Sequence, residues 1–294
     1  MSTGIPTSFF KFISVRGGLA VLEKTTIGYR QALDLNDPFE LQPAITHHTR
    51  CAKEPGLIGA ANGDDDAAWS VARFDRLPDY RERVREYART HAVLSLSGTV
   101  DATALLDATT GHEDDPRRNL LMWAYYGEGH KGLVLEFGAE VSNIVPQAVH
   151  YDEERAELTF EDIDENPVLP YLQKGSVWSH EREWRIVIPV DDAMERCDPT
   201  CYLSPFPPQA LRSVTIGCNA AEETVDAVRQ ALWGREKYAH VALRRARICK
   251  KKFQLEFFLE YPSNEVVDGK RVVGWSNSSE FGADLITTQR RPTA

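Results

Sequence analysis

The chain has 294 residues, of which 42% are hydrophobic and 27% charged, a balance typical of a globular protein that buries a sizeable core. Its 34 Lys and Arg residues against 44 Asp and Glu residues give a formal net charge of -10, so the field of the whole molecule repels nucleic acid and anionic membranes. A nucleic-acid partner would therefore need a local basic patch.

No apolar run approaches the length that spans a bilayer, and residues 1–8 lack the charged start and apolar centre of a signal peptide. We therefore expect a cytoplasmic protein without a membrane partner. The five cysteines form an odd set without the double pair typical of zinc sites, which favours incidental free thiols over a metal site. They are Cys51, Cys197, Cys201, Cys218 and Cys249.

The N-terminal part of the chain predicts a strand, a helix and a second strand in succession. Residues 9–14 have the apolar pattern of a strand, 17–26 have helical spacing, and 27–33 predict another strand. The Asn-Asp-Pro sequence at 36–38 then predicts a turn, because Asx side chains bond their own backbone and proline fixes a dihedral angle.

The middle of the chain mixes polar helical segments with short strands. Residues 64–90 are polar, with apolar positions at helical spacing, and 91–97 alternate as a strand does. A short helix at 119–126 ends at a glycine-rich turn before an apolar strand at 133–137. The later predicted elements are strands at 148–151, 184–188, 211–217, 240–248 and 251–261, an acidic helical stretch through Glu165 to Leu172, and a helix at 220–234.

This order of elements predicts the α+β class. No internal repeat or low-complexity linker separates the chain into modules. We therefore expect one domain over residues 9–260, with a mostly antiparallel β-sheet core, continuous or split, and peripheral helices. Residues 261–294 are expected to form a polar C-terminal extension.

Two carboxylates stand at the start of the predicted strand at 184–188. Glu181 and Glu183 are two residues apart, so an extended chain would place both on one face, which Arg185 continues. A neighbouring cation would hold both acids ionised and position them for a ligand that carries hydroxyl groups. A solvated strand face is the alternative, but the flanking Trp178 and Trp184 favour a partly enclosed site.

A second candidate lies on the glycine-rich turn. His130 and Lys131 follow Trp123, in a setting where backbone amides and a cation could meet phosphate oxygens. The sequence Gly-Glu-Gly-His-Lys-Gly has neither Walker nor dinucleotide-binding spacing. The alternative is a surface turn whose neighbouring aromatic residues belong to the core.

Weaker candidates lie in the first two strands and in the turn that follows them. Lys11 either holds a nucleotide phosphate or ribose, or extends its amine from the strand end to solvent. Tyr29 and Arg30 lie in the second strand. Asp37 and Glu40 are turn residues or metal ligands, and the turn is favoured because two isolated acids make a weak magnesium site.

A dense basic run lies near the predicted strand at 240–248. Half of its side chains would face one side of a strand and attract phosphate, despite the negative total charge. A charged sheet edge that resists aggregation explains the run equally well. Its members are Arg244, Arg245, Arg247, Lys250, Lys251 and Lys252.

Six segments taken in order carry a family resemblance: FFKFIS, LDLNDPFEL, VLSLS, NLLMWAYYGEGHKGLVLEF, VHY and KGSVWSHEREWRI. Together they resemble a widespread bacterial family known only as domain of unknown function 2971. The resemblance runs from about Phe9 to Phe257. Its most specific parts are the Trp-x-x-Tyr-Gly-x-x-His-Lys-Gly and Glu-x-Glu-Trp-Arg segments.

The order of elements is also similar to the ADP-ribosyltransferase fold, particularly its toxin and antiphage branches. Both begin with a strand that carries a polar anchor, continue with a helix and a second strand, and have a late acidic residue. In that fold a first-strand residue contacts the nicotinamide ribose, a second-strand residue lines the nicotinamide pocket, and a late glutamate holds the ribose hydroxyl. The resemblance assigns these roles to Lys11, Tyr29 and Glu183, with Glu181 completing a Glu-x-Glu pattern.

The resemblance implies an ADP-ribosyltransferase-like enzyme that uses NAD as substrate, needs no metal, and modifies a nucleic-acid or protein acceptor. It also implies an antitoxin or defence-system partner. Glu183 would stabilise the developing oxocarbenium ion as nicotinamide leaves, with Glu181 beside it. The residues expected to bind the cofactor are Lys11, Tyr29, Arg30, Trp123, His130, Lys131 and Arg185.

Two other functions stay open at the level of sequence. One is a metal-dependent nuclease, in which carboxylates and a lysine would carry a two-metal displacement. Its residues would be Asp37, Glu40, Glu181, Glu183 and Lys131. The other is a non-catalytic nucleotide- or protein-binding module, in which the same polar residues form a recognition pocket or a structural network.

Overall fold

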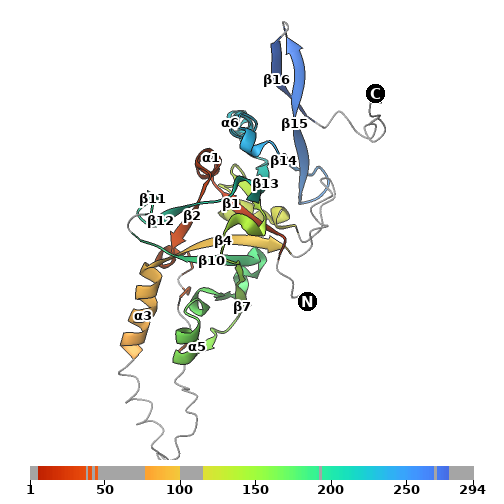
Figure 1. Ribbon diagram of the computed structural model, residues 1–294. Helices are drawn as coiled ribbons and strands as arrows, with labels where there is room; N and C mark the ends of the chain where they lie inside the picture. Colours follow the sequence, from red (N-terminus) through yellow and green to blue (C-terminus); the bar gives the residue numbers. More distant parts are fainter. Residues whose placement is uncertain are drawn as a thin grey trace, which may run out of the picture. The chain divides into compact units, whose positions relative to one another are not determined.

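A computed structural model describes residues 6–37, 39–41, 44–45, 77–99, 115–191, 194–267 and 270–277 (Figure 1). The described chain is a mixed α/β protein with a large, mostly antiparallel sheet and few helices, which confirms the fold class at this level. Its helices are α1 (Val15–Lys24), α3 (Leu77–Arg89), α4 (Leu120–Tyr125), α5 (Phe160–Glu165) and α6 (Glu222–Trp233). No described helix has both the length and the apolar character needed to cross a membrane.

The strands are short, apart from β4 and the two strands nearest the C-terminus. They are β1 (Ser8–Ile13), β2 (Thr26–Gln31), β3 (Ala44–Ile45), β4 (His91–Thr99), β5 (Leu133–Phe137), β6 (Gln147–Ala148), β7 (His150–Asp152), β8 (Glu157–Leu158), β9 (Gln173–Gly175), β10 (Glu183–Pro189), β11 (Arg196–Asp198), β12 (Cys201–Pro205), β13 (Leu211–Ile216), β14 (Ala242–Ile248), β15 (Leu255–Val267) and β16 (Lys270–Asn277).

The chain divides into two compact units, a finer division than the single domain expected over 9–260. Unit 1 contains the described parts of Met1–Thr25, Ser97–Val141 and Phe206–Ala294. Unit 2 contains the described parts of Thr26–Leu96 and Ser142–Pro205. The boundary falls inside β4, after Leu96.

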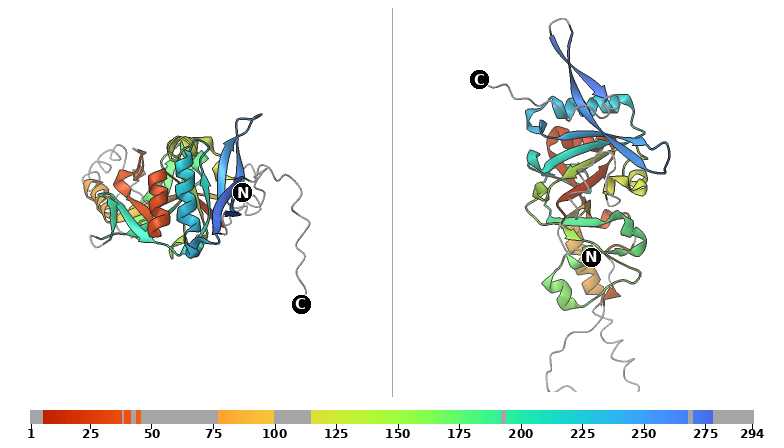
Figure 2. Two further views of the ribbon diagram at one scale, coloured as in Figure 1. Left: turned by 90° about the horizontal axis from the view of Figure 1, so that it is seen from above. Right: turned by 90° about the vertical axis from the view of Figure 1, so that its right-hand side faces the viewer.

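Unit 1 is built on a sheet in which β1 pairs with β5. The last residues of β4 pair with β1, and the order continues through β5, β13, β14, β15 and β16. The β13–β14 pair is parallel, with α6 as the crossover between the two strands, and the other pairs in this series are antiparallel. Figure 2 shows α1 and α6 side by side, and the two helices are in contact.

The apolar alternation of β1 supplies part of the core of unit 1. Phe10 and Phe12 pack in one cluster with Trp123 of α4, whose indole NH donates to the carbonyl oxygen of Arg117 at 2.7 Å. Ser14, predicted as the end of the strand, instead caps α1, because its hydroxyl accepts the amide of Gly17 at 3.2 Å. Core packing and capping together fix the strand-to-helix junction.

The turn between α4 and β5 uses an unusual backbone. Glu128, Gly129 and His130 are consecutive left-handed residues, with φ of 52°, 61° and 67°. Side chains at such angles are strained, so the turn is held by its surroundings. Gly132 follows, and a Cβ atom there would lie 2.3 Å from the carbonyl oxygen of Ile13. Only glycine therefore permits this close approach of β5 to the end of β1.

Unit 2 contains the strand series β11, β12, β2 and β4, with β10 paired to both β4 and β6. Two small parallel sheets, β3–β8 and β7–β9, complete it. One core cluster joins Ala88 of α3 to Val93 of β4, Tyr171 and Val187 of β10. The cluster shows that the C-terminal turn of α3 packs on the sheet of unit 2.

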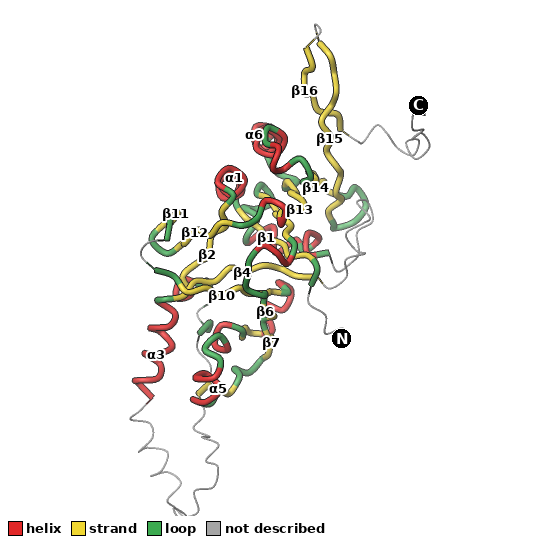
Figure 3. The backbone as a smooth tube through the Cα atoms, in the orientation of Figure 1, coloured by secondary structure: helices red, strands yellow, loops and turns green. Residues whose placement is uncertain are grey.

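Several elements differ from their predicted form. The strand expected at 148–151 is two strands, because the amide of Val149 bonds to Glu183 and that of His150 bonds to Leu172. The extension expected from residue 261 begins inside β15, which forms a long hairpin with β16 (Figure 3). A helical region was expected at 64–90. Residues 77–90 of it are described, and they form α3 and the residue that follows it, whereas residues 64–76 lie outside the described chain.

Candidate functional site

Five charged side chains of unit 2 form a buried ion-pair network. Lys174 of β9 is 3% exposed, and its Nζ lies 2.6 Å from Glu181 Oε2, 3.3 Å from Glu183 Oε2 and 3.5 Å from Glu40 Oε1. The network, which Arg185 completes, has three carboxylates and two cations, for a formal charge of about -1. All five residues are buried, so each charge depends on its neighbours for stabilisation.

Arg185 is the second cation and the best-bonded member. Its Nε and Nη2 donate to the two carboxylate oxygens of Glu183 at 2.7 and 2.9 Å, a bidentate pair. Its Nη1 donates to the carbonyl oxygen of Tyr171 at 2.6 Å and lies 2.7 Å from Glu40 Oε2. The guanidinium thus fixes the position of Glu183 and joins Glu40 to the network.

The pKa values in the network follow the balance of burial and charge. Burial opposes the ionisation of Glu183, yet Arg185 and then Lys174 outweigh it and lower the pKa to about 2. At Glu40 burial dominates, and the pKa is raised despite the two cations. Burial also disfavours the ammonium form of Lys174, but three carboxylates, Glu183 foremost, overcome it and raise the pKa. Glu183 is therefore a permanent anion at neutral pH.

The local backbone explains how Glu181 reaches the network. The prediction that one extended strand presents both carboxylates is wrong, because Glu181 ends a 3₁₀ helix, Ser176–Glu181, and only Glu183 lies in β10. Arg182 between them is left-handed, with φ of 48°, and ends the 3₁₀ helix before β10 begins. Both carboxylates nevertheless meet at Lys174, and the tyrosine hydroxyl of Tyr151 accepts the amide of Glu183 at 2.8 Å.

An open pocket of about 820 Å³ lies against this network, and we call it the acidic pocket. Lys174 forms part of its lining, together with Trp178, whose ring centroid is 5.0 Å from Lys174 Nζ. Phe39 also lines it, 63% exposed, with the guanidinium of Arg155 5.2 Å from its ring centroid. Both aromatic rings of the lining therefore already hold a cation.

The charge of the acidic pocket is negative. Its lining contains three basic side chains, those of His150, Arg155 and Lys174, and that of Lys174 is neutralised by its carboxylates. Its acidic lining residues are Asp37, Asp152, Glu153 and Glu154. Backbone amides of Glu154 and Glu153 bond to Asp152 and lower its pKa, which favours the ionised form of this carboxylate. Of the expected tryptophan walls, Trp178 lines this pocket and Trp184 does not.

Tyr29 and Arg30 lie in unit 2 on β2 but bind other partners. Tyr29 is 2% exposed, and burial raises its pKa, although its hydroxyl bonds to Ser142. Arg30 Nη1 donates to both carboxylate oxygens of Asp198 at 2.9 and 3.0 Å. Neither residue lines the acidic pocket.

The other residues expected to bind NAD belong to unit 1. Lys11 lies on β1, opposite Leu135 of β5. Trp123 is fully buried in the core. This agrees with the alternative interpretation, in which the aromatic residues beside the turn belong to the core. His130 and the exposed Lys131 stand on the left-handed turn after α4. Lys11, Tyr29 and Glu183 are thus not all part of one compact unit.

The residues proposed for a nuclease are divided in the same way. Asp37 stabilises a turn, because its carboxylate accepts the amide of Phe39 at 2.9 Å, and its carbonyl oxygen accepts that of Glu40. The carboxylates of Glu40, Glu181 and Glu183 surround the ammonium group of Lys174. Lys131 belongs to unit 1.

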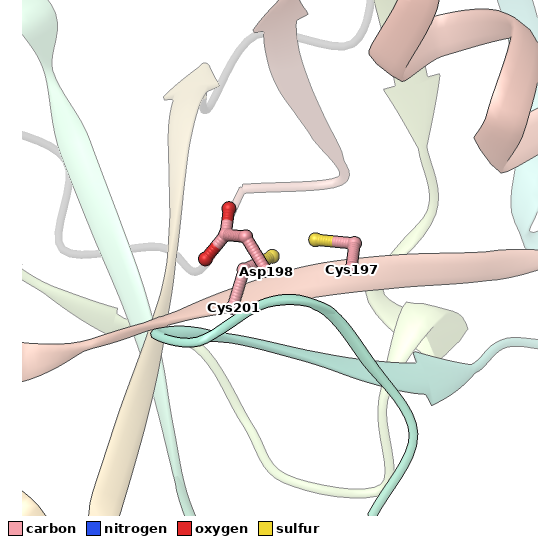
Figure 4. Close-up of side chains that lie close together, drawn as sticks. All are labelled: Cys197, Asp198 and Cys201. Atoms are coloured by element: carbon pink, nitrogen blue, oxygen red, sulfur yellow. The ribbon is translucent and has the colours of Figure 1, made fainter.

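Within the described chain, one group places three possible metal-ligand atoms within 4.8 Å of one another: Cys197, Asp198 and Cys201 (Figure 4). Asp198 is already bound to Arg30. Burial raises the pKa of Cys201 to about 12, and the nearby Cys197 adds to the effect. A metal ion at this group would have to displace the thiol proton of Cys201 and the Arg30 partner of Asp198.

Lys174 is the member of the network that the sequence did not single out. It opens the Lys174–Pro189 segment, seven residues before Glu181, and nothing in its spacing marks it as a partner. The one sequence feature that could have indicated this partner is a lysine seven residues before a Glu-x-Glu-x-Arg run. The sequence indicates Glu40 only as a turn residue or metal ligand, because its partners are far away in the sequence.

No protein-family description, no curated protein and no solved structure matches this chain. The function proposed below therefore rests on the geometry of the site.

Proposed function

We propose that unit 2 is a non-catalytic recognition module that binds a positively charged side chain of a partner protein in the acidic pocket. The buried network is its structural frame, and the exposed acids and aromatic rings are its recognition surface. This proposal develops the third hypothesis from the sequence, a non-catalytic binding module. Some of the polar residues form the structural network, and others line the recognition pocket.

The saturation of Glu183 carries the proposal. Glu183 is 5% exposed, and its two carboxylate oxygens are bound by Arg185 and Lys174. A catalytic carboxylate has to exchange such partners for a substrate, which leaves buried cations unpaired at a cost of about 3–5 kcal/mol. A network of this kind is better suited to hold β9 and β10 in place than to react.

The charge of the pocket defines its ligand. The acidic loop at 152–154 attracts a cation. The rings of Phe39 and Trp178 line the same pocket, and their contacts with Arg155 and Lys174 show that each ring can accept a cation. A nucleotide phosphate would meet like charge from the same loop. An arginine or lysine side chain satisfies both features, because its apolar stem packs on a ring while its charged end reaches a carboxylate.

ADP-ribosyl transfer from NAD is the second candidate. It is favoured by the low pKa of Glu183, which keeps a carboxylate ionised beside Arg185 and near an aromatic-lined pocket. This candidate function is the one implied by the resemblance to the ADP-ribosyltransferase fold, which accompanies the resemblance to the family of unknown function 2971. It requires the Glu183 carboxylate to be released from its partners when NAD binds.

Isothermal titration with short acetylated peptides tests the first candidate. Peptides with one central arginine or lysine should bind, and the neutral citrulline analogue should not. Glu153→Gln/Glu154→Gln should weaken binding about 10-fold, since each lost charge contributes on the order of 0.5–1 kcal/mol at a partly exposed site. The matched control is Glu161→Gln/Glu165→Gln, which removes two exposed charges from α5 of the same unit.

The same protein separates the two candidates. Incubation with NAD should release no nicotinamide, and NAD should not raise the melting temperature. Nicotinamide release that disappears in a folded Glu183→Gln variant would instead establish the transferase. Equal weakening by the α5 control would show that peptide binding does not depend on the acidic pocket.

A further inference from the structure

The acidic pocket belongs to unit 2, and another pocket, of about 410 Å³, lies in unit 1. We call it the lysine pocket. Its rim is the loop between β14 and β15, which contains Lys250, Lys251, Lys252 and Phe253. Its lining also includes His130, from the left-handed turn after α4. The fold therefore joins the two phosphate-binding candidates of the sequence, the basic run and the histidine turn, in one place.

The aromatic residue of the rim has no packing role in unit 1. Phe253 is 103% exposed, more than any other large hydrophobic side chain in the described chain, and Ile248 nearby is 67% exposed. An exposed phenylalanine gives a free ring face, on which a planar group can stack. Its position directly after three lysines places that face beside positive charge.

The lysine pocket has a positive local field in a molecule of net charge -10. Among the described residues that line it there are three lysines and no acidic residue. The rest of the basic run differs, since Arg245 of β14 is paired with Glu222 of α6 at 2.5 Å. The charge available to a ligand is thus concentrated on the loop.

The floor of the lysine pocket offers neutral polar groups. The side-chain Nδ1 of His130 is buried and has no hydrogen-bond partner among the described residues, and burial lowers the pKa of the ring. Asn219 also lines the pocket, and its backbone amide donates to the carbonyl oxygen of His130 at 2.9 Å, while its side-chain Nδ2 donates to the carbonyl oxygen of Gly129 at 3.4 Å. A neutral imidazole and a carboxamide can bond to base edges without selecting for charge.

We propose that the lysine pocket binds single-stranded nucleic acid, with Lys250–Lys252 on its phosphates and Phe253 stacked on a base. Cationic side chains next to an exposed aromatic ring are the combination that holds single strands, because phosphates meet charge while an unpaired base covers the ring. The pocket volume is within the range of small-ligand pockets, so it accepts one flipped base or nucleotide unit. A base pair in a duplex keeps its faces stacked and does not offer them.

Fluorescence anisotropy with a labelled 15-nucleotide single strand tests this site in the full-length chain. Lys251→Ala/Lys252→Ala should reduce the dependence of log K on log salt by about 1.4, since each phosphate contact on a single strand contributes about 0.7. Arg16→Ala/Lys24→Ala, which removes two exposed charges from α1 of the same unit, should leave that slope unchanged. The comparison separates local contacts from total charge.

Substitution of the aromatic residue tests stacking separately. Phe253→Ala should weaken binding about 5- to 100-fold at constant salt and leave the salt dependence unchanged. Phe253→Trp should retain the affinity. The control is Tyr125→Ala, which removes another aromatic side chain, 60% exposed, from α4.

Three results would overturn the proposal. One is no binding of the single strand at low salt, and another is equal weakening by the test and control variants. The third is binding of anionic phosphatidylserine vesicles but not of the oligonucleotide, which would assign the loop to a membrane surface. All variants replace exposed residues, so an unchanged urea unfolding curve is expected and shows that they are folded.

Discussion

The acidic pocket and the lysine pocket use charge in opposite ways. Beside the acidic pocket, five charged groups are buried and form ion pairs with one another, so they order the structure and have little contact with solvent. At the lysine pocket, three lysines are exposed on a loop, with no acid in the lining of that pocket as described. Buried charges depend on their partners, whereas exposed ones contribute little to stability and stay available to ligands.

The largest expected effect is the loss of the central cation of the network. Arg185→Met should lower the free energy of unfolding by about 3–5 kcal/mol, because it leaves the buried Glu183 and Glu40 without a guanidinium. Urea unfolding followed by tryptophan fluorescence measures it. Arg212→Met, at an arginine that is 41% exposed and paired with Glu140, is the control and should cost at most about 1 kcal/mol. Equal losses would remove the contrast between buried and exposed charge.

The second effect is a pH dependence of stability. The folded pKa of Glu183, about 2, lies below its ordinary value of 4.5. Its contribution, at most about 3 kcal/mol, is therefore present above pH 4.5 and lost as the pH falls from 4.5 towards 2. Urea unfolding between pH 5 and pH 2.5 should show a smaller decrease for Glu183→Gln than for the wild type.

Glu40 provides the opposite sign within the same network. Its folded pKa is raised, so its contribution favours folding at low pH and is lost as the pH rises through that pKa. Glu40→Gln should therefore remove a decrease in stability that the wild type shows as the pH rises above 4.5, whereas Glu183→Gln acts below pH 4.5. Changes of the same sign in both variants would contradict the assigned pKa directions.

A smaller effect is expected where the network meets the acidic pocket. Trp178→Leu should cost about 0.5–2 kcal/mol of stability, because Lys174 Nζ loses its contact with the indole face. Trp178→Phe keeps a ring and should recover part of the loss in thermal unfolding. No difference between the two variants would mean that the cation–π contact does not contribute.

The smallest effect is expected at the loop of unit 1. Lys251→Ala/Lys252→Ala should change the free energy of unfolding by less than about 0.5 kcal/mol, because both side chains are exposed. Urea unfolding in parallel with the Arg185 variant measures it. A loss above about 1 kcal/mol would show that the lysines are structural, and the two pockets would then resemble each other.

Local pattern was sufficient for many elements of the fold. The strand at 133–137 was predicted with its observed bounds, because a short, mostly apolar run between two glycines predicts a buried strand that ends at the glycines. The helix at 119–126 and the helix at 220–234 were likewise predicted within a few residues of α4 and α6. In contrast, β11 and β12 had no clear alternation and were missed, and β12 is defined by its pairing with β2.

The candidate site was predicted only in its local part. The Glu-x-Glu-x-Arg run drew attention to Glu181, Glu183 and Arg185, since charges beside tryptophans at a strand are unusual. The left-handed backbone of Arg182 between the two acids could not be predicted, because this conformation has no reliable sequence signature at an arginine.

By itself the sequence determined which short segments become strands and helices and which carry clustered charge, because periodicity, capping and glycine content act over a few residues. Only the tertiary structure decided which charges are partners. Glu40 meets Lys174 and Arg185 from more than 130 residues away, and His130 shares a pocket with Lys250–Lys252 from across unit 1. Such contacts depend on sheet pairing between distant strands, and this pairing also decides whether a charged residue becomes a buried support or an exposed ligand contact.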